Sequence, residues 1–135
     1  MKVIVIGGVA GGAGAAARLR RLDESAEIIL LERGECISYA NCGLPYHLGK
    51  VIPERSALLV MSPEKFRERF AVDVRTRSEA VAIDRAKKTV STRNGKTGET
   101  TTESYDKLVI ATGTSPVPAA IHVADLPGGF HLWTI

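Results

Sequence analysis

The thiol of Cys42 is the side chain with the clearest chemical potential in this sequence. Pro45 suits the first turn of a helix, which predicts that Asn41 or Cys42 lies near the N-cap. A thiol there would have its thiolate stabilised by free backbone N–H groups and the helix dipole, and would act as a nucleophile. Cys36 lacks this context, and the five residues between the two cysteines do not match the spacing of a redox-active dithiol. We therefore predict a one-thiol centre at Cys42; the alternative is that Cys42 is a small buried hydrophobe.

A second chemical pattern is a run of small residues near the N-terminus. The run reads Gly7, Gly8, Val9, Ala10, Gly11 and Gly12. On the dinucleotide-binding frame G-x-G-x-x-G, Gly7 is the first glycine, Gly12 is the third and Val9 replaces the middle one. Small residues let the chain turn tightly from strand to helix and let helix N–H groups reach a pyrophosphate. Taken alone, the glycines are equally consistent with a merely tight turn.

Glu32 completes the same pattern. It follows Gly7 by 25 positions (32 − 7) and comes directly after the apolar run Glu27–Leu31. An acidic side chain at the end of a second strand can accept hydrogen bonds from both ribose hydroxyls of an adenosine, and it would repel a 2′-phosphate. Together with the glycines, Glu32 predicts a dinucleotide site.

A β-α-β unit must position these residues. The β-branched run Lys2–Ile6 predicts a buried parallel strand, Gly11–Leu22 predicts a helix and Glu27–Leu31 predicts the second strand. A secretory signal or membrane span is the alternative for the N-terminus. Glycines interrupt the apolar run, arginines follow it at once, and it is shorter than the about 20 residues that a span needs.

The remaining sequence predicts short elements that complete an α/β fold. They are a helix over Glu64–Phe70, a strand over Ala71–Arg75, runs over Glu79–Asp84, Lys88–Arg93 and Glu99–Tyr105, and the segment Tyr105–Gly113, a buried strand that ends in a turn of small residues. Asn94-Gly95 marks a hairpin, so the three runs predict a small antiparallel β-meander.

Composition limits the classes of function. At 135 residues the chain has the length of one domain, and its net charge of +3 is too weak to indicate a nucleic-acid partner. Two cysteines do not make a disulfide scaffold, which predicts a reducing, cytoplasmic compartment. We expect a small-molecule substrate and no membrane partner. His47, His122 and His131 share no ligand spacing, so we predict no metal.

A longer motif makes the interpretation specific. The segment 38–46 reads Ser-Tyr-Ala-Asn-Cys-Gly-Leu-Pro-Tyr. With the glycine run and Glu32, it resembles the single-cysteine branch of the pyridine nucleotide–disulfide oxidoreductases, and within that branch the coenzyme A disulfide reductases. The resemblance implies a Rossmann-type FAD-binding domain in which Cys42 cycles between a thiolate and a mixed disulfide with coenzyme A, while NAD(P)H reduces the flavin.

The resemblance also implies binding roles for individual residues. The implied FAD contacts are Gly7, Gly8, Val9, Ala10, Gly11, Gly12, Glu32, Arg33, Ala80, Ala111, Thr112 and Gly113. The implied coenzyme A contacts are Gly14, Arg18, Arg21, Ser38 and Asn41. Guanidinium groups independently suit phosphates, although a solvated helix face is the alternative for these arginines. The family can carry a basic residue where Phe70 stands here, which leaves one phosphate contact in doubt.

Position 10 separates members of this branch. The similar NADH oxidases and peroxidases have a histidine there, whereas Ala10 cannot act as an acid or base. The expected function is therefore a FAD-dependent NAD(P)H:disulfide oxidoreductase that reduces coenzyme A disulfide. NADH oxidase or persulfide reductase of the same branch, and a truncated non-catalytic nucleotide-binding fragment, are the alternatives.

The expected domain organisation follows from the length. Residues 1–113 would be the FAD-binding domain, with the meander at about 79–105, and residues 114–135 a linker toward an NAD(P)H-binding domain that the chain lacks. The resemblance implies a homodimer. We expect the incomplete N-terminal part of a flavoenzyme with two dinucleotide domains, without NAD(P)H-dependent turnover of its own.

Overall fold

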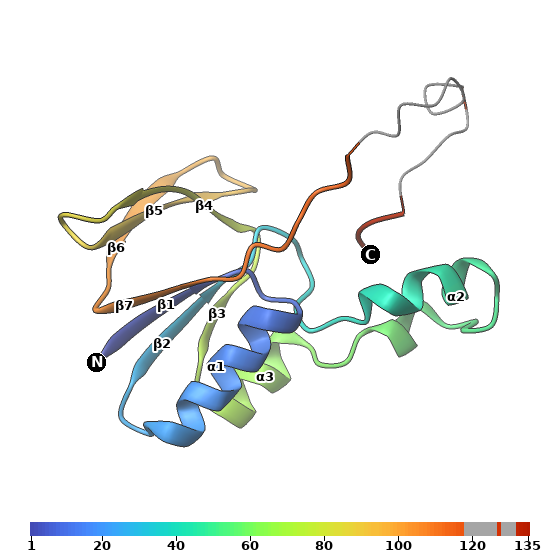
Figure 1. Ribbon diagram of the computed structural model, residues 1–135, viewed down its shortest axis with the longest axis horizontal. Helices are drawn as coiled ribbons and strands as arrows, with labels where there is room; N and C mark the ends of the chain where they lie inside the picture. Colours follow the sequence, from blue (N-terminus) through green and yellow to red (C-terminus); the bar gives the residue numbers. More distant parts are fainter. Residues whose placement is uncertain (118–126, 128–131) are drawn as a thin grey trace.

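A four-stranded parallel sheet forms the centre of the molecule (Figure 1). The computed structural model describes residues 1–117, 127 and 132–135. The strands are β1 (Lys2–Ile6), β2 (Glu27–Leu31), β3 (Asp73–Arg75) and β7 (Lys107–Ile110), in the spatial order β3-β2-β1-β7. Both neighbours of β1 pair with it in parallel, as the buried apolar runs predict.

Two helices cover one face of this sheet. They are α1 (Ala10–Leu22) and α3 (Pro63–Phe70), and Figure 1 shows them on the same side of the strands. Side chains alternate along β1, so Val3 and Val5 belong to the helix-covered core, where Ala16 and Phe66 pack. The β-α-β unit predicted from the sequence is confirmed.

A three-stranded antiparallel sheet covers the other face. Its strands are β4 (Ser78–Asp84), β5 (Thr89–Asn94) and β6 (Thr100–Ser104), so the predicted meander is also confirmed. Val90 from β5 packs in a core cluster with Ile4 of β1.

Glu103 ties the two sheets together. Its carboxylate accepts hydrogen bonds from Lys2 Nζ in β1 (2.8 Å) and from Arg75 Nη1 in β3 (2.7 Å), while Glu103 itself stands in β6. These charge-assisted bonds hold the pKa of the Glu103 carboxyl below its ordinary value, because they favour the ionised form.

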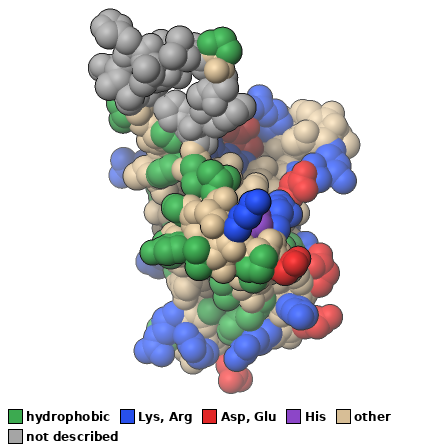
Figure 2. Space-filling view, turned by 90° about the vertical axis from the view of Figure 1, so that its right-hand side faces the viewer, with side chains coloured by type: hydrophobic (Ala, Val, Ile, Leu, Met, Phe, Trp, Pro, Cys, Tyr) green, Lys and Arg blue, Asp and Glu red, His purple; other side chains and the backbone are tan. Residues whose placement is uncertain are grey.

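A separate arm carries the cysteine segment. It contains the short 3₁₀ turns η1 (Asn41–Gly43) and η2 (Arg55–Leu58) and the helix α2 (Leu44–Leu48), which lie apart from α1 and α3 in Figure 1. Figure 2 faces this side and shows apolar side chains at the surface. The exposed apolar residues of the arm are Tyr46, Leu48, Val51, Leu59 and Val60.

Several elements differ from their predicted bounds by one or two residues at an end, and β3 shows a physical reason for this. The strand expected over Ala71–Arg75 begins only at Asp73, because Ala71 takes a left-handed conformation (φ +47°) that ends α3. The guanidinium of Arg20 donates to the carbonyls of Phe70 and Ala71, both at 2.8 Å, and so satisfies groups that the helix end leaves without intrahelical partners. None of the helices in the described part of the chain is long and apolar enough to cross a membrane.

Candidate functional site

The glycine run forms a turn in which two positions exclude any side chain. Gly7 has a φ of +100°, and a Cβ placed on it would lie 2.2 Å from the carbonyl oxygen of Ala111. A Cβ on Gly12 would lie 1.7 Å from the carbonyl oxygen of Gly7. Val9 has an ordinary negative φ of −87°, so a side chain is tolerated in the middle position of the frame. The tight strand-to-helix turn predicted from the sequence is present.

The first turn of α1 opens from this run. Val9 is its N-cap residue, and among the described residues no side chain caps the helix and none in the first turn is acidic. Helix N–H groups without such partners, together with the positive end of the helix dipole, are suited to an anion such as a pyrophosphate.

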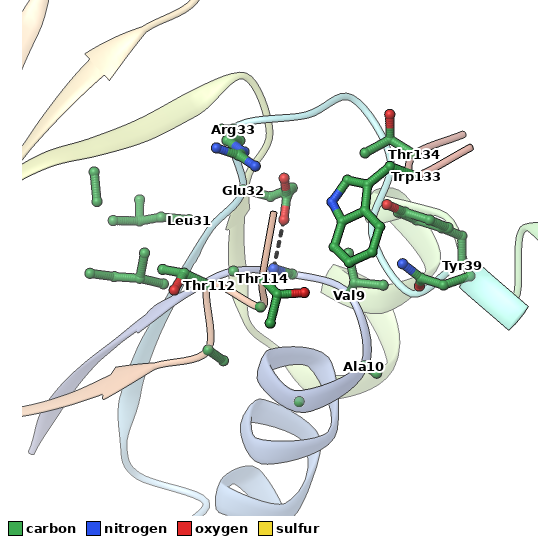
Figure 3. A pocket seen from close by; sticks show the side chains of 18 of the residues that line it. Val9, Ala10, Leu31, Glu32, Arg33, Tyr39, Thr112, Thr114, Trp133 and Thr134 are labelled. Atoms are coloured by element: carbon green, nitrogen blue, oxygen red, sulfur yellow. Dashed lines mark hydrogen bonds between the residues drawn. The ribbon is translucent and has the colours of Figure 1, made fainter. Parts of the chain in front are cut away.

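Glu32 is held rigidly beside the same turn. The residue is 9% exposed, and its two carboxylate oxygens accept from the backbone N–H of Gly8 and of Gly34, each at 2.7 Å. Figure 3 shows the bond between the Glu32 side chain and the turn as a dashed line. A carboxylate has about four acceptor positions, so these two bonds orient Glu32 and leave capacity for ribose hydroxyls.

One cavity of about 550 Å³ joins these features (Figure 3). Of the twelve residues predicted to contact FAD, it is lined by Gly7, Gly8, Val9, Ala10, Gly11, Glu32, Arg33, Ala80, Ala111, Thr112 and Gly113. Gly12 is outside this lining and acts through the geometry of the turn. The volume and the mixture of apolar and polar walls fit a ligand the size of a nucleotide cofactor.

Cys42 stands in the wall of the same cavity, and its side chain is exposed. The alternative that it is a buried hydrophobe is therefore wrong. The predicted helix is present as α2, with Pro45 in its first turn, and Cys42 directly precedes the N-cap residue Gly43, as expected. Asn41 directly follows Ala40, the N-cap of η1, and neither cap residue makes a side-chain capping bond within the described chain. Gly43 packs so closely on Leu58 that a Cβ would lie 2.6 Å from the leucine side chain.

The predicted coenzyme A contacts do not gather in this cavity. Asn41 lines it, whereas Gly14, Arg18 and Arg21 lie on an exposed face of α1, where residues four and seven apart share one side. Ser38, with a φ of +48°, is fixed through its backbone to Gly8 and Val60.

Phe70 belongs to the core rather than to a phosphate site. Its ring centroid lies 4.7 Å from that of Phe66, and the guanidinium carbon of Arg69 is 5.5 Å from the centroid of Phe70.

Several lining residues were not predicted from the sequence. The additional residues are Ile6, Leu31, Tyr39, Ala40, Ser78, Glu79, Thr114, Trp133 and Thr134. Tyr39 is half-buried, and burial, followed by the negative charge of Glu32, raises the pKa of its phenol. Tyr39 could have been found from its place in the cysteine motif; Trp133 gave no signal beyond being the only tryptophan.

No cluster suited to a metal occurs among the described residues, where three or more His, Cys, Asp or Glu side chains never gather. His122 and His131 lie outside the described residues.

Comparison with known proteins defines the class. The pattern of the pyridine nucleotide-disulphide oxidoreductase family matches residues 1–134, and the chain belongs to this family. The α/β fold with a parallel and an antiparallel sheet is the Rossmann-type fold of its FAD-dependent oxidoreductases, and the resemblance inferred from the sequence is confirmed.

Three individual members of the family show how far the similarity extends. The chain is 46% identical over 114 residues to the coenzyme A disulfide reductase of Staphylococcus aureus (strain JH9), which is 84% of this chain and 26% of that protein. The structure of reduced CoADR-RHD from Bacillus anthracis has a TM-score of 0.86 and 52% identity, over 89% of this chain and 22% of that chain. The NAD-dependent persulfide reductase from A. fulgidus has a TM-score of 0.90 and 38% identity, over 98% and 24%. The chain thus spans about a quarter of the length of the relatives it matches.

Proposed function

We propose that this chain supplies the FAD-binding portion and the redox thiol of a disulfide oxidoreductase that uses NAD(P)H and acts on coenzyme A disulfide. The observation that carries the proposal is the position of an exposed Cys42 thiol in the wall of the cavity that also holds the glycine turn and Glu32. When a nucleotide site and a reactive thiol share one cavity, electrons can pass between a cofactor bound at that site and a disulfide formed on the thiol.

The residues present fit FAD. The glycine turn, which Glu32 orients through Gly8, would offer backbone N–H groups to the pyrophosphate, and the carboxylate of Glu32 would accept hydrogen bonds from the ribose of the adenosine half. The negative charge of Glu32 disfavours a 2′-phosphate at the same place. When bound, FAD supplies a route for two electrons from NAD(P)H to a disulfide.

Cys42 carries the substrate half of the reaction. Its thiolate attacks one sulfur of coenzyme A disulfide, so that a Cys42–coenzyme A disulfide forms and one coenzyme A leaves as a thiolate. Two electrons that originate from NAD(P)H then cleave the mixed disulfide, which releases the second coenzyme A as a thiolate and restores the Cys42 thiolate. Arg18 and Arg21 are exposed on α1 with charges that suit coenzyme A phosphates, and Gly14 and Asn41 complete the proposed path with Ser38.

Ala10 favours this disulfide chemistry over oxygen chemistry. It lines the cavity but offers no acid or base that could serve a peroxide or sulfenate intermediate. Persulfide reduction is the second candidate function, because the persulfide reductase from A. fulgidus matches nearly the whole chain.

The proposed organisation keeps residues 1–113 as the FAD-binding unit. Strand β7 pairs with β1, and the Ala111 N–H donates to Ile6 at 2.8 Å, which brings residues 111–113 to the glycine turn. Residues 114–135 are proposed as the linker to a nicotinamide domain; most of them lie outside the described residues. We place the whole enzyme in the cytoplasm as a homodimer.

Adduct formation tests the proposal without requiring turnover. The reduced chain is treated with coenzyme A disulfide and examined by mass spectrometry, with Cys42→Ser as the test variant and Cys36→Ser as the matched control. We expect one coenzyme A adduct on the wild type and on Cys36→Ser, and none on Cys42→Ser. An adduct on Cys36 alone would contradict the assignment of Cys42 as the redox thiol. Failure of the chain to form a yellow complex with FAD would contradict the cofactor assignment.

A further inference from the structure

Trp133 is an aromatic wall of the cavity that the sequence did not predict. Its indole lines the cavity together with Tyr39, and it comes from the far end of the chain. Figure 3 draws the indole between the ring of Tyr39 and the carboxylate of Glu32, above Val9. The residue is 38% exposed, so part of its aromatic surface remains open to a ligand.

The neighbours of Trp133 place it at one end of the cavity. Thr134 lines both the main cavity and an adjoining one of about 370 Å³. The smaller cavity is walled mostly by residues 32–36, which directly follow β2, and also by Tyr39 and Arg55 of the arm; Cys42 is absent from its lining in the described chain. The segment that carries Trp133 therefore lies at the Glu32 end.

We propose that the indole of Trp133 packs against the adenine ring of the bound dinucleotide and so fixes its adenosine half. This inference rests on the proposed function, because it takes FAD as the ligand and Glu32 as the ribose acceptor. An adenine joined to a ribose at Glu32 lies within reach of side chains around that carboxylate. Aromatic side chains bind bases by stacking without a requirement for hydrogen bonds.

The lone tryptophan provides a direct measurement. Because the sequence has one tryptophan, the intrinsic tryptophan emission of the chain comes from Trp133 alone. The chain is titrated separately with FAD, with ADP as the adenosine half and with FMN as the flavin half, and N-acetyltryptophanamide corrects for light absorbed by the ligands. We expect a saturable change in emission with ADP, which cannot accept the excitation energy of tryptophan and therefore reports contact with the adenosine half. FAD and FMN accept that energy from a distance, so quenching by either one reports only that it binds.

Variants test whether the contact contributes to binding. Trp133→Ala is expected to weaken FAD binding about ten-fold in calorimetry, whereas Trp133→Phe keeps the affinity within about three-fold. Leu132→Ala is the matched control, since Leu132 is an exposed neighbour in the same segment and is not part of the described lining of either cavity. Circular dichroism establishes that each variant is folded.

The outcomes separate this inference from the proposed function. Calorimetric binding of ADP without a change in emission, or wild-type affinity for FAD in Trp133→Ala, would each overturn the role of Trp133 while leaving the FAD site standing. A folded wild-type chain that binds neither FAD nor ADP would overturn both.

Discussion

Replacing Gly12 by alanine tests the geometry of the glycine turn. The added Cβ would lie 1.7 Å from the carbonyl oxygen of Gly7, whereas real Cβ atoms essentially never approach closer than 3.0 Å. The start of α1 or the end of β1 must therefore move by more than about 1 Å. Both elements are packed in the core, where such displacement costs about 1–3 kcal/mol or more.

Gly14 provides the matched control on the same helix. A Cβ there meets no described atom within 4 Å, and the residue is exposed. Gly14→Ala should stabilise the protein by about 0.5–1 kcal/mol, because alanine restricts the unfolded chain and favours a helix.

Urea unfolding followed by circular dichroism measures both changes. We expect a lower midpoint for Gly12→Ala and a higher one for Gly14→Ala, with FAD binding weakened in Gly12→Ala at temperatures where it is still folded. Equal midpoints for the two variants would refute the claim that the turn, rather than helix propensity, requires glycine at position 12.

Two further predictions concern contacts between elements. Glu103→Gln should cost about 1 kcal/mol at pH 7. Lys2 and Arg75 lower the folded-state pKa of this carboxyl, so its contribution to the free energy of unfolding is present above the unfolded-state pKa. The contribution is lost as the pH falls through the lower folded-state pKa. In urea unfolding between pH 7 and pH 3, the stabilities of the two proteins should therefore become equal below about pH 4. A constant difference down to pH 3 would contradict this. Arg20→Met should lower the free energy of unfolding in urea by about 1–2 kcal/mol, since it removes hydrogen bonds to the end of α3. The control Arg18→Met, on the exposed face of α1, should change it by less than about 0.5 kcal/mol. Similar losses in the two variants would show that Arg20 acts only as a surface charge.

The sequence predicted best those features that depend on local patterns. The bounds of Lys2–Ile6 and Glu27–Leu31 match the structure, because a short β-branched run in a buried sheet has few alternative registers. The tight turn at the glycine run could also be predicted, since the close contact that requires glycine joins Gly7 and Gly12, which are near each other in the sequence.

The sequence failed where distant segments decide the conformation. Nothing in the local pattern around Cys42 predicts that Gly43 packs on Leu58. Trp133 reaches the cavity from the opposite end of the chain, and no spacing rule connects it to Glu32. Such contacts have no periodicity to detect, because they depend on tertiary packing.

The order of the strands explains why the site lies where it does. The chain passes from β1 to β2 on one side, while β7 pairs with β1 on the other, so the strand order reverses direction at β1. In an open parallel sheet, such a switch point leaves a crevice beyond the carboxyl ends of the strands. Gly7 follows β1, Glu32 follows β2 and Ala111 follows β7, and all three line the cavity. The glycine turn alone therefore does not make the site; the site also requires β7, which returns after about 75 residues that form β3, the meander and the cysteine arm. Because the arm leaves the sheet directly after Glu32, the same topology that creates the crevice also carries Cys42 to its wall.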